Sequence, residues 1–251
     1  MSRVIIITGA NNGIGLALTQ SLLEMGDRVA ALDLTGENLR QTNPNLQYYT
    51  CDVTDPMRVG QVVGEVVNTW GGVDVLVNNA CIAPFKPFIE CSLDDIRGVF
   101  EVNYFGYINL IQAVLPTMLK QRRGVIHNLS SGVGITGYPG ISGYASTKGA
   151  IEALTRTLAL ELADSGITVN LMHPPLTRTK SASPLGVPLE MMADPVEVGR
   201  KLAKKVGRTQ PVLTPDLGSR LGIAANQHFP VPMGRFLASM AKRAERKNVN
   251  P

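Results

Sequence analysis

The sequence predicts an α/β fold: one doubly wound, mostly parallel sheet with helices on both faces, of the Rossmann-like type. Residues 4–7 form a β-branched run, and a glycine-rich turn and a helix-like segment follow it directly. Further short apolar runs alternate with segments of helical periodicity along most of the chain. The chain has 251 residues, of which 44% are hydrophobic and 18% charged, and this size and composition suit one large domain of this class.

The turn at residues 8–15, Thr-Gly-Ala-Asn-Asn-Gly-Ile-Gly, joins the first predicted strand to the first predicted helix. Glycines in such a turn let the backbone bend tightly and approach a pyrophosphate, while the following helix presents free N–H groups at its start. The glycine spacing differs from the commoner G-x-G-x-x-G pattern. We therefore predict that the turn binds a dinucleotide cofactor through Gly9, Asn12, Gly13, Ile14 and Gly15.

The second predicted strand, residues 28–34, brings an acid to the same edge of the sheet. Asp33 lies eighteen residues after Gly15. A carboxylate at this place accepts hydrogen bonds from both ribose hydroxyls of an adenosine and repels a 2′-phosphate, so the sequence favours NAD over NADP. A tight loop with a solvated acid is the alternative, and the order strand, turn, helix, strand argues against it.

Asp52 and Val53 follow a short predicted strand at residues 48–50. The Asp52 carboxylate either contacts the adenine edge of the cofactor, beside Val53, or caps the helix that begins near Pro56. The sequence leaves both interpretations open.

A buried strand at residues 73–77 ends at Asn78, Asn79 and Ala80. Polar side chains that follow a parallel strand face the cofactor crevice in open α/β sheets. They can also stabilise the junction between strand and loop, and the two roles are compatible. We predict that Asn79 and Ala80 contact the cofactor.

A long helical segment, residues 92–120, carries Asn103 in its interior. Asparagine is a poor residue for a helix interior, which suggests a functional role for Asn103, although an exposed asparagine would need no explanation. The predicted strand at residues 124–129 then leads to Ser130 and Ser131.

Tyr144 and Lys148 lie four residues apart at the head of a predicted helix, residues 144–162, whose apolar residues recur at helical spacing. Both side chains therefore project from the same helix face. With unit charges about 5 Å apart and an effective dielectric of about 20, the Coulomb energy is roughly 3 kcal/mol. This energy is enough to lower the pKa of Tyr144 toward neutral pH, so the pair is the predicted acid and base.

These residues resemble the short-chain dehydrogenase/reductase family over roughly the first 180 residues. Residues 8–15 resemble its nucleotide loop, residues 78–80 the signature of its fourth strand, and Asn103 its helix asparagine. Tyr144 and Lys148 resemble its Tyr-x-x-x-Lys catalytic pair. Each motif alone is weak, but their order and spacing argue strongly against coincidence.

The resemblance implies a role for each catalytic residue. Tyr144 would donate or accept the proton at the substrate oxygen, and Lys148 would lower its pKa and hold the nicotinamide ribose. The family's active serine lies thirteen residues before the tyrosine, which selects Ser131 over Ser130, and its hydroxyl would position the substrate oxygen. Asn103 would hold a water that connects Lys148 to solvent. Hydride would pass between the nicotinamide and the substrate carbon.

Two positions depart from the family pattern. The family has Gly after Asn-Asn-Ala where this chain has Cys81, and it has Pro-Gly where this chain has Pro174 and Pro175. Proline at position 175 fixes φ and removes an N–H beside the expected nicotinamide. By its spacing from Pro174, the family's threonine contact to the carboxamide falls on Thr179, with Thr177 as the weaker candidate.

The substrate is expected to be apolar. Residues 176–210 form the predicted substrate lid, and the flexible side chains of Met191 and Met192 suit a lipid-, steroid- or fatty-acyl-like molecule. They suit ordinary packing equally well. Phe85 and Phe88 are predicted to add aromatic walls.

The remaining Cys and His residues are interpreted as structural. Cys51, Cys81 and Cys91 form no CxxC pair, so we expect a reduced chain of cytoplasmic location, without a metal site. His173 is not needed as an acid or base once Tyr144 fills that role. The apolar run at the start is too short for a signal peptide, and no segment approaches the length of a membrane span.

The C-terminal part is basic. Residues 200–251 contain eleven Lys or Arg and two acids, against thirteen and eighteen in residues 1–199. We expect residues 1–251 to form one dinucleotide-binding catalytic domain with a basic helical tail at about 216–251. The tail's apolar helix face is Met233, Phe236, Leu237, Met240 and Ala244, and its cations are Arg235, Lys242, Arg243, Arg246 and Lys247. Such a helix packs on its own domain, folds over the substrate cleft, or binds weakly to an anionic membrane surface.

The sequence therefore predicts an NAD(P)-dependent oxidoreductase that interconverts a secondary alcohol and a ketone. The resemblance implies a homodimer or homotetramer formed through the helices around residues 92–120 and 144–164. Basic charge without interleaved aromatic residues does not support nucleic-acid binding. The alternative is a non-catalytic NAD-binding sensor or scaffold protein, for which Cys81 and Pro175 are the hints. The complete set of Asn103, Ser131, Tyr144 and Lys148 argues against it.

Overall fold

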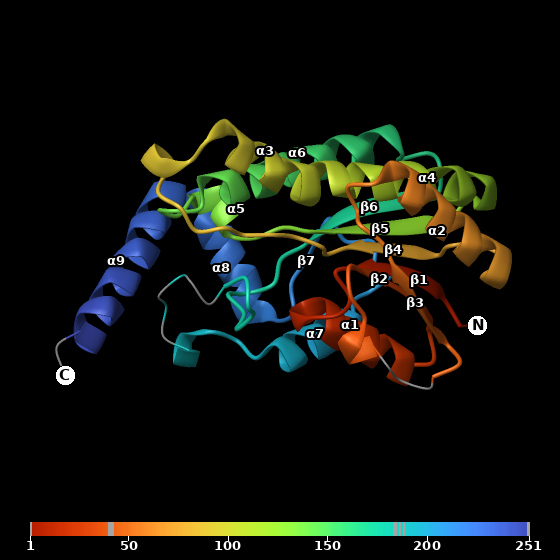
Figure 1. The fold of residues 1–251 in the computed structure, drawn as a ribbon, viewed down its shortest axis with the longest axis horizontal. Helices are drawn as coiled ribbons and strands as arrows, with labels where there is room; N and C mark the ends of the chain where they lie inside the picture. The colour runs from red at the N-terminus through yellow and green to blue at the C-terminus, as the bar shows by residue number, and fades with distance from the viewer. Residues whose placement is uncertain (1, 40–42, 183–184, 186, 188, 250–251) are drawn as a thin grey trace.

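The sheet has the predicted doubly wound, parallel arrangement. The computed structural model describes residues 2–39, 43–182, 185, 187 and 189–249, with side chains up to residue 241. Within them seven parallel strands lie in the order β3-β2-β1-β4-β5-β6-β7 (Figure 1). The strands are β1 (Val4–Thr8), β2 (Arg28–Asp33), β3 (Leu46–Thr50), β4 (Val75–Asn78), β5 (Gly124–Leu129), β6 (Ile167–Met172) and β7 (Val212–Leu213). The strand order reverses between β1 and β4, where a crevice opens at the carboxyl ends of such sheets.

Helices cover both faces of the sheet (Figure 1). One face carries α1 and α7, and the other carries α2, α4 and α6. The helices of the described chain are α1 (Gly13–Glu24), α2 (Pro56–Trp70), α3 (Leu93–Phe100), α4 (Gly106–Gln121), α5 (Val133–Thr136), α6 (Ser142–Glu161), α7 (Pro195–Ala203), α8 (Leu217–His228) and α9 (Pro230–Val249).

The central strand β1 is buried on both faces because its side chains alternate between two cores. Ile5 and Ile7 pack with Leu18 and Leu22 of α1 in one core. Ile6 packs in the other core, among side chains of α2 and α4. All five residues of β1 are buried. The run of β-branched residues therefore fixes the middle of the sheet and, with it, the position of the turn that follows.

The predicted long helix at residues 92–120 is two helices joined by a π-helical turn. Ser92 caps α3, and the turn Glu101–Phe105 connects α3 to α4. A π-turn places one extra residue in the helix, so the side chains on either side of it follow different registers. Asn103 lies inside this turn and is completely buried, which explains why a poor helix former is tolerated there.

The tail contains two helices that pack on α5. Residue Gly234 of α9 lies so close to α5 that a Cβ added there would stand 2.7 Å from the Thr136 carbonyl oxygen. From this contact α9 runs away from the sheet (Figure 1). The last strand of the sheet, β7, has two residues and pairs with β6. None of the helices in the described part of the chain has both the length and the apolar character needed to span a membrane.

Candidate active site

The glycine turn is joined to the end of β4 by side-chain hydrogen bonds. The Thr8 hydroxyl oxygen accepts the N–H groups of Asn79 at 3.0 Å and Ala80 at 3.1 Å. In return, the Asn79 amide donates to the carbonyl oxygens of Thr8 at 2.9 Å and Gly9 at 3.0 Å. Two segments that the sequence assigns to cofactor binding are thus held together at the point where the strand order reverses.

The backbone of this turn fits the close approach of a phosphate. Gly9 and Gly13 have φ values of 64° and 54°, which favour glycine. A Cβ at Gly15 would stand 2.1 Å from the Gly9 carbonyl oxygen, and one at Gly13 would stand 3.1 Å from Cγ2 of Thr179. The exposed Asn12 side chain makes no capping bond to α1. The first N–H groups of α1, from Gly13 and Ile14 onward, therefore have no side-chain cap, and they fit an anionic dinucleotide phosphate.

Asp33 lies beside the turn, as predicted, and its carboxylate already has two partners. One oxygen accepts the Asn11 N–H at 2.8 Å and the other accepts the Leu34 N–H at 2.8 Å. A carboxylate offers about four lone-pair positions, so each oxygen can still accept a ribose hydroxyl. The arrangement fits an adenosine ribose.

Asn11 is a residue that the sequence interpretation missed. Its side chain is completely buried and donates to Thr35 Oγ1 and Glu37 Oε2, both at 3.0 Å, and accepts the Asn38 N–H at 2.9 Å. It thus fixes the loop after β2. The available signal was a second asparagine directly before Asn12, within a turn whose backbone polar groups need partners.

The interpretation of Asp52 as a helix cap is wrong. Asp55 caps α2, because its carboxylate accepts the N–H groups of Met57 and Arg58, each at 3.0 Å. The Asp52 carboxylate accepts bonds from Thr54 instead. Val53 is buried, and its carbonyl oxygen accepts the Asn109 amide at 2.9 Å. The adenine contact of Asp52 and Val53 stays a prediction.

The helix α6 brings Tyr144 and Lys148 together beneath Ser131. The Lys148 ammonium is buried and lies 5.6 Å from the centroid of the Tyr144 ring. It donates to the Leu129 carbonyl oxygen at 2.8 Å and to Tyr107 Oη at 3.3 Å. Ser131, and not Ser130, lies close enough to the Tyr144 hydroxyl to lower its pKa. The structure thus brings three of the predicted catalytic residues together and adds Tyr107, which the sequence interpretation missed.

The predicted lowering of the Tyr144 pKa is wrong for this arrangement. Burial raises the pKa of Tyr144, the charge of Cys81 acts in the same direction, and only the Ser131 hydrogen bond lowers it. Burial also lowers the pKa of Lys148. The desolvation of the phenol outweighs the ammonium, which bonds to Leu129 and Tyr107 rather than to the phenol. The Tyr144 phenol is therefore neutral at neutral pH.

Asn103 fixes the loop after β4 to α6. Its amide oxygen accepts the Ile82 N–H at 2.8 Å, and its amide nitrogen donates to the Ile82 carbonyl at 2.9 Å and to Thr147 Oγ1 at 3.2 Å. Both amide hydrogens are thus used in bonds that do not involve Lys148. A water held by Asn103 beside Lys148 stays a prediction.

The wall after β6 contains the two prolines and two threonines. The methyl group of Thr179 approaches Gly13, which places Thr179 at the mouth of the nucleotide turn. Thr177 is buried, and its hydroxyl donates to the Pro175 carbonyl oxygen at 2.7 Å. Pro174 and Pro175 are half-buried. Their contact with a nicotinamide, like that of Thr179, stays a prediction.

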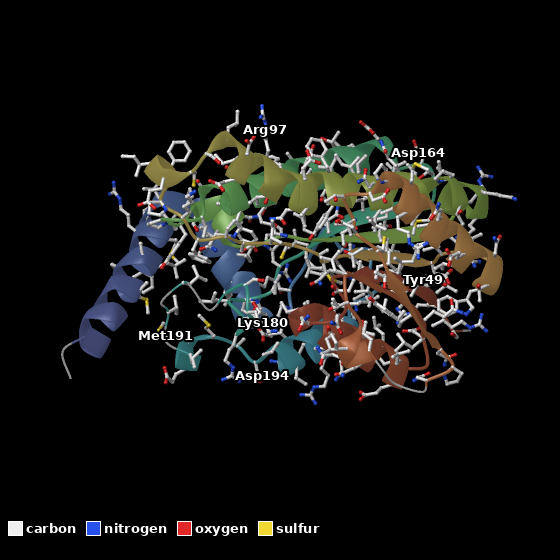
Figure 2. The ribbon with its side chains drawn as sticks, in the orientation of Figure 1. Tyr49, Arg97, Asp164, Lys180, Met191 and Asp194 are labelled. Carbon is white, nitrogen blue, oxygen red and sulfur yellow. The ribbon has the colours of Figure 1, made fainter. Side chains whose placement is uncertain are left out.

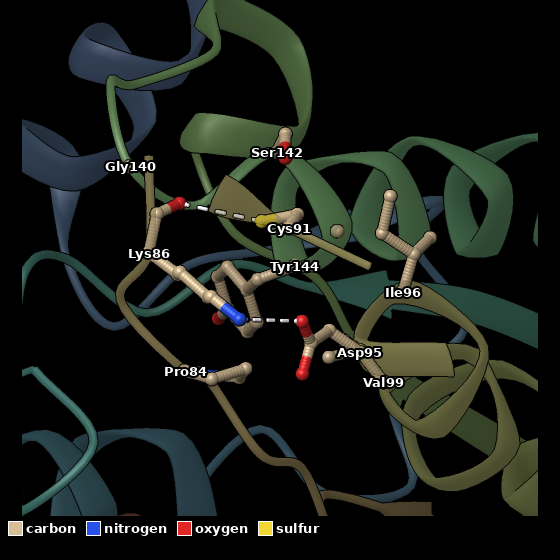
Figure 3. A pocket seen from close by; sticks show the side chains of 10 residues that line it. Pro84, Lys86, Cys91, Asp95, Ile96, Val99, Gly140, Ser142 and Tyr144 are labelled. Atoms are coloured by element: carbon tan, nitrogen blue, oxygen red, sulfur yellow. Dashed lines mark hydrogen bonds and ion pairs between the residues drawn. The ribbon is translucent and has the colours of Figure 1, made fainter. Parts of the chain in front are cut away.

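Tyr144 also lines a pocket (Figure 3). Lys86 crosses it and forms an ion pair with Asp95 at 2.7 Å. The lining residues are Pro84, Lys86, Cys91, Asp95, Ile96, Val99, Gly140, Ser142, Gly143 and Tyr144. Phe88 is exposed, and neither Phe85 nor Phe88 lines this pocket, so the predicted aromatic walls are wrong there. Pro87 directly precedes a short 3-10 helix, Phe88–Glu90, so Phe88 lies at the start of that turn.

The predicted lid lies at the crevice end of the molecule. Figure 2 shows Lys180, Met191 and Asp194 on the side of the sheet opposite to α6, far from Asp164. Met192 is buried while Met191 is half-exposed, so the two methionines divide between packing and solvent. The predicted lid residue Pro184 lies outside the described residues. Among the described residues, no group of three or more His, Cys, Asp or Glu is placed to hold a metal ion.

Comparison with known proteins identifies a single family. The short chain dehydrogenase family profile matches residues 3–187. The 3-oxoacyl-[acyl-carrier-protein] reductase FabG of Thermotoga maritima is 39% identical over 184 residues, covering 70% of this chain and 75% of that protein. The 2-(R)-hydroxypropyl-CoM dehydrogenase of Xanthobacter autotrophicus is 37% identical over 198 residues, covering 71% and 76%.

Two solved structures also superpose on this chain. A short-chain dehydrogenase from Streptomyces avermitilis superposes over 100% of both chains with a TM-score of 0.79 at 25% identity. The structure of ElxO with NADP bound superposes with a TM-score of 0.77 at 26% identity, covering 88% of this chain and 100% of that one.

Proposed function

The chain belongs to the short-chain dehydrogenase family and is an NAD(P)-dependent oxidoreductase; from this premise we propose that it interconverts a secondary alcohol and a ketone, with Tyr144 as the proton-transfer residue. The observation that carries the proposal is the joint placement of Ser131, Tyr144 and Lys148 at the crevice beside the glycine turn. Proton transfer by a positioned side chain needs this proximity before any tuning of pKa.

The residues divide the reaction between them. When bound, the nicotinamide exchanges a hydride with the substrate carbon. In the direction of reduction, the neutral Tyr144 phenol gives its proton to the substrate oxygen, which becomes the alcohol hydroxyl. The Ser131 hydroxyl holds the same oxygen. The buried Lys148 ammonium then stabilises the Tyr144 phenolate until a proton returns from solvent. In the direction of oxidation the steps run in reverse: Tyr144 first gives its proton to solvent, and the phenolate then takes the proton of the alcohol hydroxyl.

The cofactor we propose is NAD. The carboxylate of Asp33 lies at the end of β2, and the carboxylate of Glu37 is bonded to Asn11 in the loop that follows. Two acids in this place oppose the 2′-phosphate of NADP. ElxO, which superposes on this chain, binds NADP, so a direct comparison of the two dissociation constants is needed. The proposed contacts also include Gly9, Asn12, Gly13, Ile14, Gly15, Asp52, Val53, Asn79, Ala80, Pro174 and Thr179.

The proposed substrate is an apolar ketone or alcohol of lipid, steroid or fatty-acyl type. Exposed apolar side chains lie on the lid and at the start of α3, among them Leu189, Met191 and Leu93. Several curated relatives are named as 3-oxoacyl-[acyl-carrier-protein] reductases, which favours a fatty-acyl ketone. Residues 176–210 would act as the lid on one domain that spans residues 1–251.

Two kinds of partner complete the proposal. A homodimer or homotetramer would form through α4 and α6, and the basic tail would bind weakly to an anionic membrane surface. The exposed side chains of Phe229, Val231 and Phe236 support the membrane contact, since aromatic and apolar groups anchor basic helices in lipid interfaces. Pelleting with anionic vesicles at low salt tests it, and absence of pelleting would end it. A cytoplasmic location stays a prediction.

The decisive experiment measures the absorbance of reduced nicotinamide across a panel of hydrophobic alcohols and ketones, with both cofactors. Replacing Tyr144 by Phe should lower turnover by roughly 10²–10⁴-fold, while cofactor binding stays measurable by calorimetry. Retained turnover in the variant would remove Tyr144 as the proton-transfer residue. Cofactor binding without turnover of any substrate by the unchanged chain would favour the sensor or scaffold alternative.

A further inference from the structure

Three buried polar side chains lie directly behind the catalytic residues and take no part in the mechanism above. They are Ser130, Glu152 and His173, called here the buried Glu–His cluster, and they are 3%, 7% and 1% exposed. Each comes from a different element: Ser130 follows β5, Glu152 lies on α6, and His173 follows β6. The cluster therefore joins three segments that meet at the active site.

Each member of the cluster is close in sequence to a residue of the site. Ser130 directly precedes Ser131, and His173 directly precedes Pro174. Glu152 lies one helical turn after Lys148, on the same face of α6. A displacement within the cluster is thus transmitted through one peptide bond to the serine and to the proline wall.

One carboxylate oxygen is the centre of the cluster. Glu152 Oε1 accepts the Ser130 hydroxyl at 3.1 Å and lies 3.5 Å from His173 Nε2. The other oxygen, Oε2, faces the Arg156 guanidinium at 3.5 Å. The distance to His173 is only about half an ångström longer than an ordinary N–H···O hydrogen bond. A small movement of either side chain closes that bond.

The imidazole of His173 is unpaired within the described part of the chain. Neither of its ring nitrogens has a hydrogen-bond partner there, although its side chain is completely buried. Unpaired buried polar groups in native proteins call for an explanation, because water would have satisfied them in the unfolded chain. Glu152 is the acceptor in reach, so the cluster has a second arrangement in which the imidazole N–H bonds to the carboxylate.

The protonation state of Glu152 decides whether that second arrangement can form. Burial lowers the pKa of His173 to about 4, and the Lys148 ammonium acts in the same direction, so the imidazole is neutral. Burial raises the pKa of Glu152, while the Ser130 hydrogen bond and the Arg156 guanidinium oppose the rise. The ionised carboxylate accepts two bonds at Oε1, but a protonated carboxyl must use one oxygen as a donor. Ionisation of Glu152 therefore changes how firmly the cluster is held.

We propose that Glu152 and His173 are positioning residues: the ionised Glu152 carboxylate holds Ser130 and His173 at once, and so fixes Ser131 relative to the wall at Pro174 and Pro175. The inference rests on the proposed function for its kinetic consequence. It also has a consequence independent of turnover, because the same wall is proposed to contact the cofactor.

The test compares Glu152→Gln, Glu152→Asp and His173→Gln with the control Glu161→Gln, an exposed glutamate at the end of the same helix. For Glu152→Gln we expect kcat to fall roughly 10-fold with a smaller change in KM, as for loss of a hydrogen bond to a charged group. The acid limb of the pH–rate profile should disappear, since it reports the ionisation of Glu152. Glu152→Asp should retain that limb, and Glu161→Gln should match the unchanged chain.

A second measurement does not depend on turnover. The dissociation constant of the cofactor should vary with pH in the unchanged chain across the range in which Glu152 ionises, and this variation should be absent in Glu152→Gln. If the unchanged chain turns over no carbonyl compound, the proposed function fails while this measurement still judges the inference.

Two outcomes would overturn the inference. One is an acid limb and cofactor affinity in Glu152→Gln that match the unchanged chain. The other is a loss of rate that is equal at every pH and is accompanied by a lower Tm, because that pattern describes a group that only supports the fold. If Glu152→Gln does not fold, His173→Gln is judged by the same two criteria, since it removes the other half of the contact.

Discussion

The nucleotide turn and the C-terminal tail of this chain are built in opposite ways. Around the turn, the polar groups of Thr8, Asn11 and Asn79 are paired within the protein, and a Cβ at Gly15 has no space. In the tail, Phe229, Val231 and Phe236 are 60%, 58% and 55% exposed. The cofactor end is thus defined by backbone geometry, whereas the tail leaves apolar surface available for a substrate or partner.

The largest effect is expected from adding one methyl group to the turn. Gly15→Ala puts a Cβ against the Gly9 carbonyl oxygen. It should weaken cofactor binding by about 100-fold, because overpacking against backbone costs roughly 1–3 kcal/mol. Titration calorimetry measures the change.

The matched control lies in α8, where a Cβ at Gly222 meets nothing within 4 Å. Gly222→Ala should stabilise the protein by about 0.5–1 kcal/mol. Equal effects of the two substitutions on cofactor binding and stability would contradict the proposed difference between the turn and the tail.

The second prediction concerns the stability of the fold at acid pH, which should depend on two buried histidines at the sheet. Burial lowers the pKa of both His127 and His173 to about 4. The unfolded chain, with histidine pKa values near 6.5, binds more protons between these two pH values, so stability is complete above about pH 6.5 and is lost as pH falls toward 4. Each histidine contributes about 1.4 kcal/mol per pH unit in that range. The raised pKa of Glu152 offsets part of this loss.

Urea unfolding at several pH values measures this slope. His127 bonds through Nδ1 to Asn170 and accepts the Gly207 N–H at Nε2, so His127→Gln should remove about one proton from the pH dependence of unfolding. An unchanged slope in that variant would show that the acid sensitivity lies elsewhere.

A third prediction, of a smaller effect, concerns the choice between NAD and NADP at the nucleotide turn. Asp33→Ala should shift the ratio of the dissociation constants for NAD and NADP by roughly 10-fold toward NADP, because it removes one charge that opposes the 2′-phosphate. Asp164, exposed in the turn after α6 (Figure 2), supplies the control Asp164→Ala, which should leave the ratio as it is. A ratio that does not respond to Asp33→Ala would contradict the proposed preference for NAD.

The smallest effect on stability is expected in the tail itself. Phe236→Ser removes an exposed apolar side chain and should change the free energy of unfolding by no more than about 0.5 kcal/mol. The same substitution should reduce pelleting with anionic vesicles. A large loss of stability would show that Phe236 belongs to a packed core. The tail would then be tightly packed, as the nucleotide turn is.

Local patterns in the sequence predicted the strands and the turn because those features depend on neighbouring residues. A β-branched run buried on both faces and a glycine whose Cβ has no space are visible within a few positions. The pairing of Tyr144 with Lys148 could also be predicted, since residues four apart on a helix lie on one face.

Contacts between residues far apart in the sequence could not be predicted in this way. The meeting of Glu152 with His173 depends on the pairing of β5 with β6 and on the packing of α6, which no local pattern contains. Tyr107 was missed because the π-turn shifts the register of α4 relative to α3. The direction of the Tyr144 pKa was wrong because the sequence shows the nearby charge but not the loss of water around the phenol.

The π-turn at Glu101–Phe105 also limits how this chain can change its length. Deleting one residue there would restore ordinary α-helical spacing but would rotate every later side chain of α4 by about 100°. Tyr107 would then leave the Leu129 carbonyl and the Lys148 ammonium, and Asn109 would lose the Val53 carbonyl. An alignment of homologues that preserve this site should therefore contain no single-residue gap at this position, although gaps in the tail carry no such penalty.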